Sequence, residues 1–175
     1  KNGNKIENGE IPVAIELSSL KINKEDFTMT KGTSETLTVT GTPAEALEGQ
    51  TITWKSSNKD VVTVDSKGKV EAVGVGNATI TATAAGKSDS VKITVNNPLK
   101  KITVDPATLT LKKGTSKTLS VKYDPADTTD NKAVTWESSD KSVATVDANG
   151  KVTALKDGSA TITAKVGKLT ATCAL

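Results

Sequence analysis

The chain repeats itself, and this repeat restricts its possible folds more than any other feature. Trp54 returns as Trp136, 82 residues further along (136 − 54 = 82), and the Lys-Gly-Thr-Ser motif at 31–34 returns at 113–116 in the same register. Nearly half of the positions between 20 and 83 are identical to their partners between 102 and 165. A period of this length indicates two copies of one small domain of about 80 residues, because the repeating unit is long enough to hold a core.

The repeat also sets the expected domain boundaries. The first domain spans residues 17–96 and the second spans 97–175. Residues 1–16 have no counterpart in the second copy, so we expect a polar leader or the end of a preceding domain, with a strand at 11–15. The chain starts at Lys1 rather than Met, so we expect a fragment or a processed product. Pro98 restricts Asn97 to extended conformations, which predicts a short, semi-rigid linker with the two domains end to end.

Apolar residues alternate with polar ones at a period of two in most of the chain. The stretches 119–123 and 160–165 show this pattern clearly, and 78–82 repeats it in the first copy. Short alternating stretches separated by turn residues are typical of an antiparallel sandwich. The sequence therefore predicts an all-β fold of two tandem antiparallel β-sandwiches joined by a short linker. The stretch 44–49 is at most one helical turn.

Two turns have the same pattern in both copies. Asp65 and Gly68 are the first and fourth residues of one turn, and Asp147 and Gly150 are the first and fourth of the other. Asp accepts hydrogen bonds from the turn backbone and Gly adopts the positive φ that closes a bulged hairpin. We interpret both pairs as turn residues, with a metal site at the two aspartates as the alternative.

Trp54 and Trp136 are the largest apolar side chains in a core that is otherwise rich in Val and Ala. Each lies in an alternating stretch beside Val or Ile, so we expect both to belong to the structural core, where an indole removes a large apolar area from water. The alternative is an exposed aromatic ring that stacks on sugars.

The second copy contains four motifs in succession: Lys-Gly-Thr, then Val-Thr-Trp-Glu-Ser-Ser, then Val-Ala-Thr-Val-Asp-Ala-Asn-Gly-Lys-Val, then Gly-Ser-Ala-Thr-Ile-Thr-Ala. This pattern resembles the bacterial immunoglobulin-like group 2 domain. The match covers 101–175 almost throughout; the first copy, about 17–95, departs at Gly41 and at 46–50. The resemblance implies immunoglobulin-like β-sandwiches that serve as modules of bacterial surface proteins, adhesins and tailed-phage virions. It carries no catalytic motif.

The composition excludes most enzymes and nucleic-acid readers. The chain has no His and no Arg, and all 23 basic residues are Lys. Without His it lacks the usual neutral-pH acid–base group, and without Arg it lacks the bidentate fork for phosphate or guanine. We expect no enzyme, no catalytic residue, no cofactor and no nucleic-acid partner. No apolar run reaches membrane-spanning length, so no membrane insertion is expected. Cys173 aligns with Val91 and is expected to be a buried small hydrophobe.

One loop has the composition of a cation site. Asp124, Asp127 and Asp130 lie close together after a strand, and oxygen ligands on a loop suit Ca²⁺. Their spacing does not match the calcium loop of EF-hands, and the first copy has only Glu45 and Glu48 there. An ordinary solvated loop is the other interpretation.

These observations predict tandem modules of a bacterial cell-surface or secreted protein, serving as a stalk or spacer or as an adhesive segment. The alternative is a decoration of a tailed-phage virion that binds host surfaces or carbohydrate weakly. The expected partners are cell-surface glycans, host surface proteins and neighbouring domains of a longer chain. Lys100-Lys101 and Lys112-Lys113 could contact an anionic wall polymer, although lysines at strand ends also prevent edge-to-edge pairing.

Overall fold

The structure is a computed structural model that describes residues 15–175. The chain divides into two compact units, 1–95 and 96–175, and each unit has a hydrophobic core of its own. The expected leader at 1–16 and its strand at 11–15 fall almost wholly outside the described residues, so they stay predictions. The predicted all-β fold is confirmed, and the expected single turn at 44–49 is a short 3₁₀ helix.

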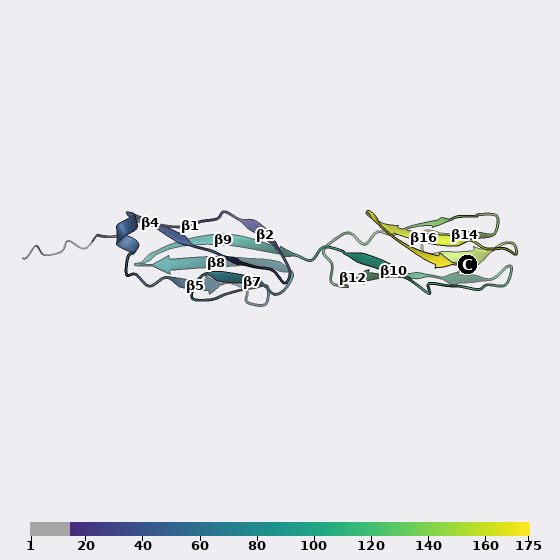
Figure 1. Ribbon diagram of the computed structural model, residues 1–175, viewed down its shortest axis with the longest axis horizontal. Coiled ribbons are helices and arrows are strands. Elements are labelled where there is room, and N and C mark those ends of the chain that lie inside the picture. The colour runs from purple at the N-terminus through teal and green to yellow at the C-terminus, as the bar shows by residue number, and fades with distance from the viewer. Residues whose placement is uncertain (1–14) are drawn as a thin grey trace, which may run out of the picture. The chain divides into compact units, whose positions relative to one another are not determined.

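The first unit alternates short strands with turns. Two long strands near its C-terminal end, β8 (Gly76–Ala84) and β9 (Lys87–Asn96), form a hairpin that runs along the unit (Figure 1). The other elements are β1 (Ser19–Ile22), β2 (Phe27–Thr30), β3 (Ser34–Thr36), β4 (Val39–Thr42), η1 (Ala44–Leu47), β5 (Thr53–Ser56), β6 (Val62–Val64) and β7 (Lys69–Ala72).

These strands form the two layers of a sandwich. One layer is a four-stranded sheet in the order β2-β9-β8-β5. The other contains the pair β1-β4 and the three-stranded sheet β3-β7-β6, which are joined because β3 and β4 are separated only by Leu37 and Thr38. Buried residues alternate with half-buried or exposed ones along β8, as expected for a strand with one face on the core.

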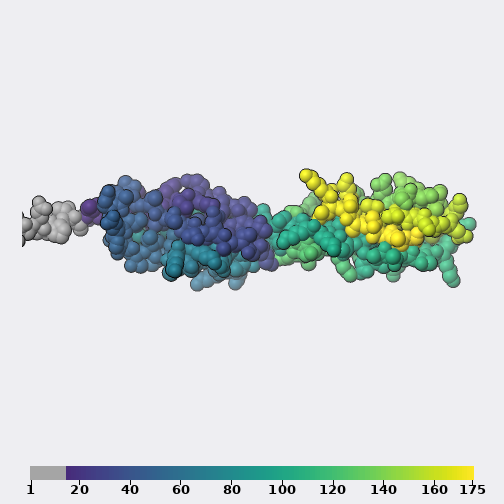
Figure 2. Space-filling view, in the orientation of Figure 1, coloured from purple at the N-terminus to yellow at the C-terminus, as the bar shows by residue number. Residues whose placement is uncertain are grey.

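The second unit repeats this arrangement. Its sheets are β10-β12, β11-β15-β14 and β13-β16-β17, and every strand pair within them is antiparallel. The strands are β10 (Lys101–Asp105), β11 (Ser116–Thr118), β12 (Ser120–Asp124), β13 (Thr135–Ser138), β14 (Ala144–Val146), β15 (Lys151–Ala154), β16 (Thr161–Val166) and β17 (Leu169–Ala174). The last strand, yellow in the space-filling view, lies on the surface of the second unit (Figure 2).

Aliphatic side chains fill the centre of both cores. Ile80 and Ile93 are fully buried in the first unit, and Ile162 and Val152 are fully buried in the second. Cys173 is also fully buried and free, which confirms the expectation of a small buried hydrophobe at this position. Burial raises the pKa of its thiol, so the protonated, apolar form is favoured.

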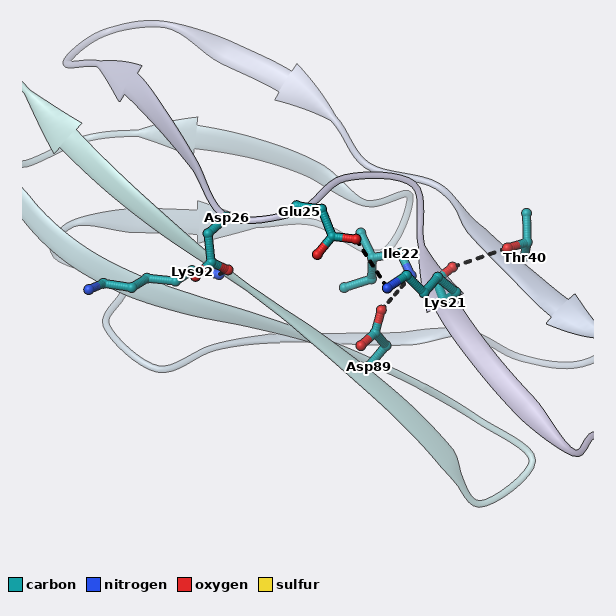
Figure 3. A network of polar contacts seen from close by, with 7 residues as sticks. All are labelled: Lys21, Ile22, Glu25, Asp26, Thr40, Asp89 and Lys92. Carbon is teal, nitrogen blue, oxygen red and sulfur yellow. Dashed lines mark hydrogen bonds and ion pairs between the residues drawn. The ribbon is translucent and has the colours of Figure 1, made fainter.

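Between β1 and β2 the chain passes from one layer of the sandwich to the other, and two carboxylates fix this crossing (Figure 3). Strand β1 pairs with β4, whereas β2 lies beside β9 in the opposite layer. At the end of β1, the Ile22 N–H donates to Asp89 Oδ2 of β9 at 2.7 Å. Just before β2, Asp26 Oδ1 accepts from the Lys92 N–H of β9 at 2.8 Å. Both carboxylates therefore tie the crossing segment to the strand that β2 joins.

Candidate functional site

The two Asp-x-x-Gly turns use their carboxylates internally. Asp65 Oδ1 accepts from the backbone N–H groups of Lys67 and Lys69 at 2.8 and 2.9 Å, and Asp147 Oδ1 accepts from Asn149 and Lys151 at the same distances. The bonds from Lys69 and Lys67 hold the pKa of the Asp65 carboxyl below its usual value. The geometry of a closed turn is therefore the same in both copies.

The glycines of these turns do more than adopt an unusual φ. Gly68 and Gly150 have φ values of +80° and +78°. A Cβ atom at Gly150 would lie 2.8 Å from Trp136 Cζ2 and 2.9 Å from the Leu119 carbonyl oxygen, and one at Gly68 would lie 2.9 Å from Trp54 Cζ2. The indole thus packs directly on the glycine, so each turn is part of the Trp environment. The turn and the Trp were predictable from the sequence, but their contact was not.

Both tryptophans are half-buried and pack against the core from its rim. Trp54 lines a surface hollow of about 250 Å³, together with Leu37, Val39 and Ile52. Trp136 lines a larger hollow of about 520 Å³, whose other walls are polar side chains. Those residues are Thr135, Glu137, Lys141, Thr163, Lys165 and Thr170. The indoles are thus partly open to solvent, and the centre of each core is aliphatic.

The acidic loop binds the backbone that enters the second unit. Asp127 Oδ1 accepts from the Asn97 side-chain amide at 2.8 Å, and Asp130 Oδ2 accepts from the Leu99 N–H at 2.9 Å. Asp124 ends strand β12, and its carbonyl oxygen accepts from the Lys100 N–H at 2.9 Å. Among residues 15–175, no three His, Cys, Asp or Glu side chains are arranged to hold a metal ion. Two of the three calcium candidates, Asp127 and Asp130, therefore accept hydrogen bonds from the protein itself.

The remaining surface offers little chemistry. The four residues of the pairs Lys100-Lys101 and Lys112-Lys113 are all exposed, as charged groups at strand ends usually are. In the described part of the chain, no helix is both long and apolar enough to cross a bilayer.

The comparisons with known proteins agree with the architecture. The model of the family "Bacterial Ig-like domain (group 2)" matches residues 17–95 and again residues 98–174. Among solved structures, the four N-terminal Ig domains of Dscam1 isoform 4.44 align with 91% of this chain and 46% of that one, with a TM-score of 0.55 and 14% identity. At this identity the likeness concerns the fold alone.

Two curated relatives show where such stretches occur. The lacto-N-biosidase of Bifidobacterium bifidum is 50% identical over 70 residues, which are 39% of this chain and 6% of that protein. The minor capsid protein of Enterobacteria phage T3 is 39% identical over 80 residues, which are 45% of this chain and 18% of that protein. The chain thus spans only a small part of these relatives. With both copies matched by the family model, the chain belongs to the bacterial Ig-like domain (group 2) family and contains two such domains.

Proposed function

We propose that the chain is a pair of non-catalytic modules in an extracellular bacterial protein, where it acts as a spacer or stalk. The observation that carries this proposal is the variety of its relatives. A lacto-N-biosidase and a minor capsid protein have different tasks by name, yet the matched stretch is 6% of one and 18% of the other. Similar stretches in such different proteins are best explained by a role that neither name states, such as spacing or presentation.

The residues that the two copies share support this view. The repeated Asp, Gly and Trp residues make turns and their packing contacts. A spacer needs only a stable fold, so selection for that fold would keep such residues and leave the surface free to vary. The setting is a bacterial surface or a secreted protein; a tailed-phage virion is the alternative, which the minor capsid relative favours.

The hollow beside Trp136 favours adhesion as a second candidate. A partly exposed indole offers an apolar face on which a sugar ring can stack, beside polar groups that can bind hydroxyls. Here the ring is accompanied by Glu137, Lys165 and Thr170, whose carboxylate, ammonium and hydroxyl groups could bind sugar hydroxyls. Cell-surface glycans are therefore the ligand class to test.

The test is binding of residues 1–175, displayed in many copies on beads, to bacteria, epithelial cells, mucin and purified wall glycans. Many copies are needed because avidity reveals weak binding. The absence of saturable binding is the result expected for a spacer. Saturable binding that is lost in the double variant Glu137→Gln, Lys165→Ala would replace the spacer with an adhesive module, whereas glycan hydrolysis by this chain would contradict both.

A further inference from the structure

The segment that leads into the second unit is saturated with hydrogen bonds. The Asn97 N–H donates to Thr129 Oγ1 at 3.1 Å, and the Asn97 carbonyl accepts from the Thr129 N–H at 2.9 Å. Pro98 has no N–H to satisfy. The next two N–H groups, those of Leu99 and Lys100, donate to Asp130 Oδ2 and to the Asp124 carbonyl, both at 2.9 Å. From 97 to 100, every backbone N–H is bound by residues 124–130.

A side chain adds to this pairing. The Asn97 amide donates to Asp127 Oδ1 at 2.8 Å, and Asn97 is only 7% exposed. Pro98 also fixes its own φ and limits the conformations of the residue before it. The backbone from 97 to 100 is therefore restricted by both covalent geometry and hydrogen bonds.

The loop that makes these contacts is itself braced. Lys132 Nζ donates to the Ala126 carbonyl at 2.8 Å and lies 5.2 Å from the centre of the Tyr123 ring. The Tyr123 hydroxyl in turn donates to the Lys132 carbonyl at 3.0 Å. We call residues 124–132 the clasp loop. Because its two ends are tied together, it presents its acceptors at fixed positions.

The first copy repeats one of these bonds, since the Ser18 N–H donates to the Thr42 carbonyl at 2.7 Å, but it lacks the Asn97 and Thr129 side chains. In the 82-residue register, Leu47 stands where Thr129 stands, so no hydroxyl is available, and Ile15 stands where Asn97 stands. The side chain of Ile15 is 57% exposed. Instead of a clasp, the equivalent loop forms the short helix η1. Of the two copies, the second alone makes the full set of clasp contacts within the described residues.

We propose that the clasp loop holds residues 97–100 in one backbone conformation, so that this segment does not work as a free hinge between the two domains. The inference is independent of whether the pair is a spacer or an adhesive module, since either could use a restrained joint. Its chemistry is the capture of backbone N–H groups by Asp130 and Thr129 and of one side-chain amide by Asp127.

The test uses Asp130→Ala in the full chain, with Glu48→Ala at the equivalent position of the first copy as the matched control. The first measurement is hydrogen exchange at the Asn97 and Lys100 amides, neither of which is bonded to Asp130. If the clasp acts as a unit, losing one bond should speed their exchange about three- to tenfold. Glu48→Ala should leave both amides unchanged.

The second measurement is the width of the distance distribution between spin labels on Lys55 and Lys165, which are exposed positions in different units. Asp130→Ala should broaden it, and Glu48→Ala should not. An unchanged width and unchanged exchange in Asp130→Ala would overturn the proposal. So would calcium binding that releases the Leu99 amide, because the carboxylate would then serve an ion rather than the chain.

Discussion

At the scale of single residues, the contact between Gly150 and Trp136 explains the Asp-x-x-Gly turn better than backbone conformation alone. Gly114 has nearly the same φ as Gly150, +80° against +78°, but a Cβ at Gly114 would meet nothing within 4 Å. The two glycines therefore separate the conformational requirement from the packing requirement. Of these two glycines, Gly150 lies under an indole and Gly114 does not.

We expect Gly114→Ala to cost about 1–2 kcal/mol, the penalty of a left-handed conformation for a residue with a Cβ. Gly150→Ala should cost about 1–3 kcal/mol more, because the new methyl group would overpack Trp136 and the Leu119 carbonyl. Urea unfolding followed by circular dichroism would measure both. Equal losses in the two variants would show that the indole contact has no energetic weight.

The lowered pKa of Asp65 predicts that the stability of the first unit depends on pH. Its folded pKa is lowered by the N–H groups of Lys69 and Lys67, so the unfolded chain binds more protons between the folded pKa and the ordinary value of about 3.9. Its stabilising effect should be fully present above that ordinary value and lost as the pH falls through the folded pKa. The stability difference between the wild type and Asp65→Asn should therefore shrink from pH 6 to pH 2 in urea unfolding. A difference independent of pH would contradict this assignment.

At the scale of elements, the sheet change between β1 and β2 depends on a carboxylate that the repeat does not conserve. Asp89 accepts the N–H of Ile22, a fully buried residue, whereas its counterpart in the second copy is Ala171. In both copies backbone bonds join the crossing segment to the last strand: β2 pairs with β9 in the first, and in the second Leu109 donates to the Ala174 carbonyl at 2.8 Å and Ala174 donates to the Ala107 carbonyl at 2.9 Å. The second copy thus makes the same change of sheet without the Asp89 carboxylate.

Asp89→Ala should destabilise the first unit by about 1–3 kcal/mol, because it leaves the Ile22 N–H without its acceptor. Lys21→Ala is the control. It removes the ion pair of Lys21 with Glu25, 3.1 Å apart and exposed, and should cost less than about 1 kcal/mol. Thermal unfolding of the two variants would rank them. The idea of a carboxylate-fixed crossing fails if Asp89→Ala is as mild as the control.

At the scale of the whole molecule, each unit contains the core that it needs. The buried residues form one cluster within 17–95 and another within 104–173. We therefore expect residues 97–175 to fold when produced alone, with a β-type circular dichroism spectrum and a cooperative melt, although so small a domain is only marginally stable. A spectrum typical of an unfolded chain would mean that this unit depends on its neighbour.

The sequence alone was sufficient to show the repeat and to predict the all-β class, the turns and the family. It could do so because side-chain alternation, Asp-x-x-Gly turns and internal identity are local signals that do not depend on distant contacts. The short 3₁₀ helix at Ala44–Leu47 agrees with the upper limit of one helical turn that the sequence set for 44–49.

The roles of the polar residues depend on contacts that exist only in the folded structure. The spacing of Asp127 and Asp130 along the chain says nothing about donors 30 residues away, so the sequence left a solvated loop and a calcium site as alternatives. The structure gives the two carboxylates Asn97 and Leu99 as donors. Trp136 was expected in the structural core. It is half-buried and packs against the core and on Gly150, a contact that the turn pattern did not reveal. These contacts join residues far apart in the chain, so they exist only once the strands have been placed in space.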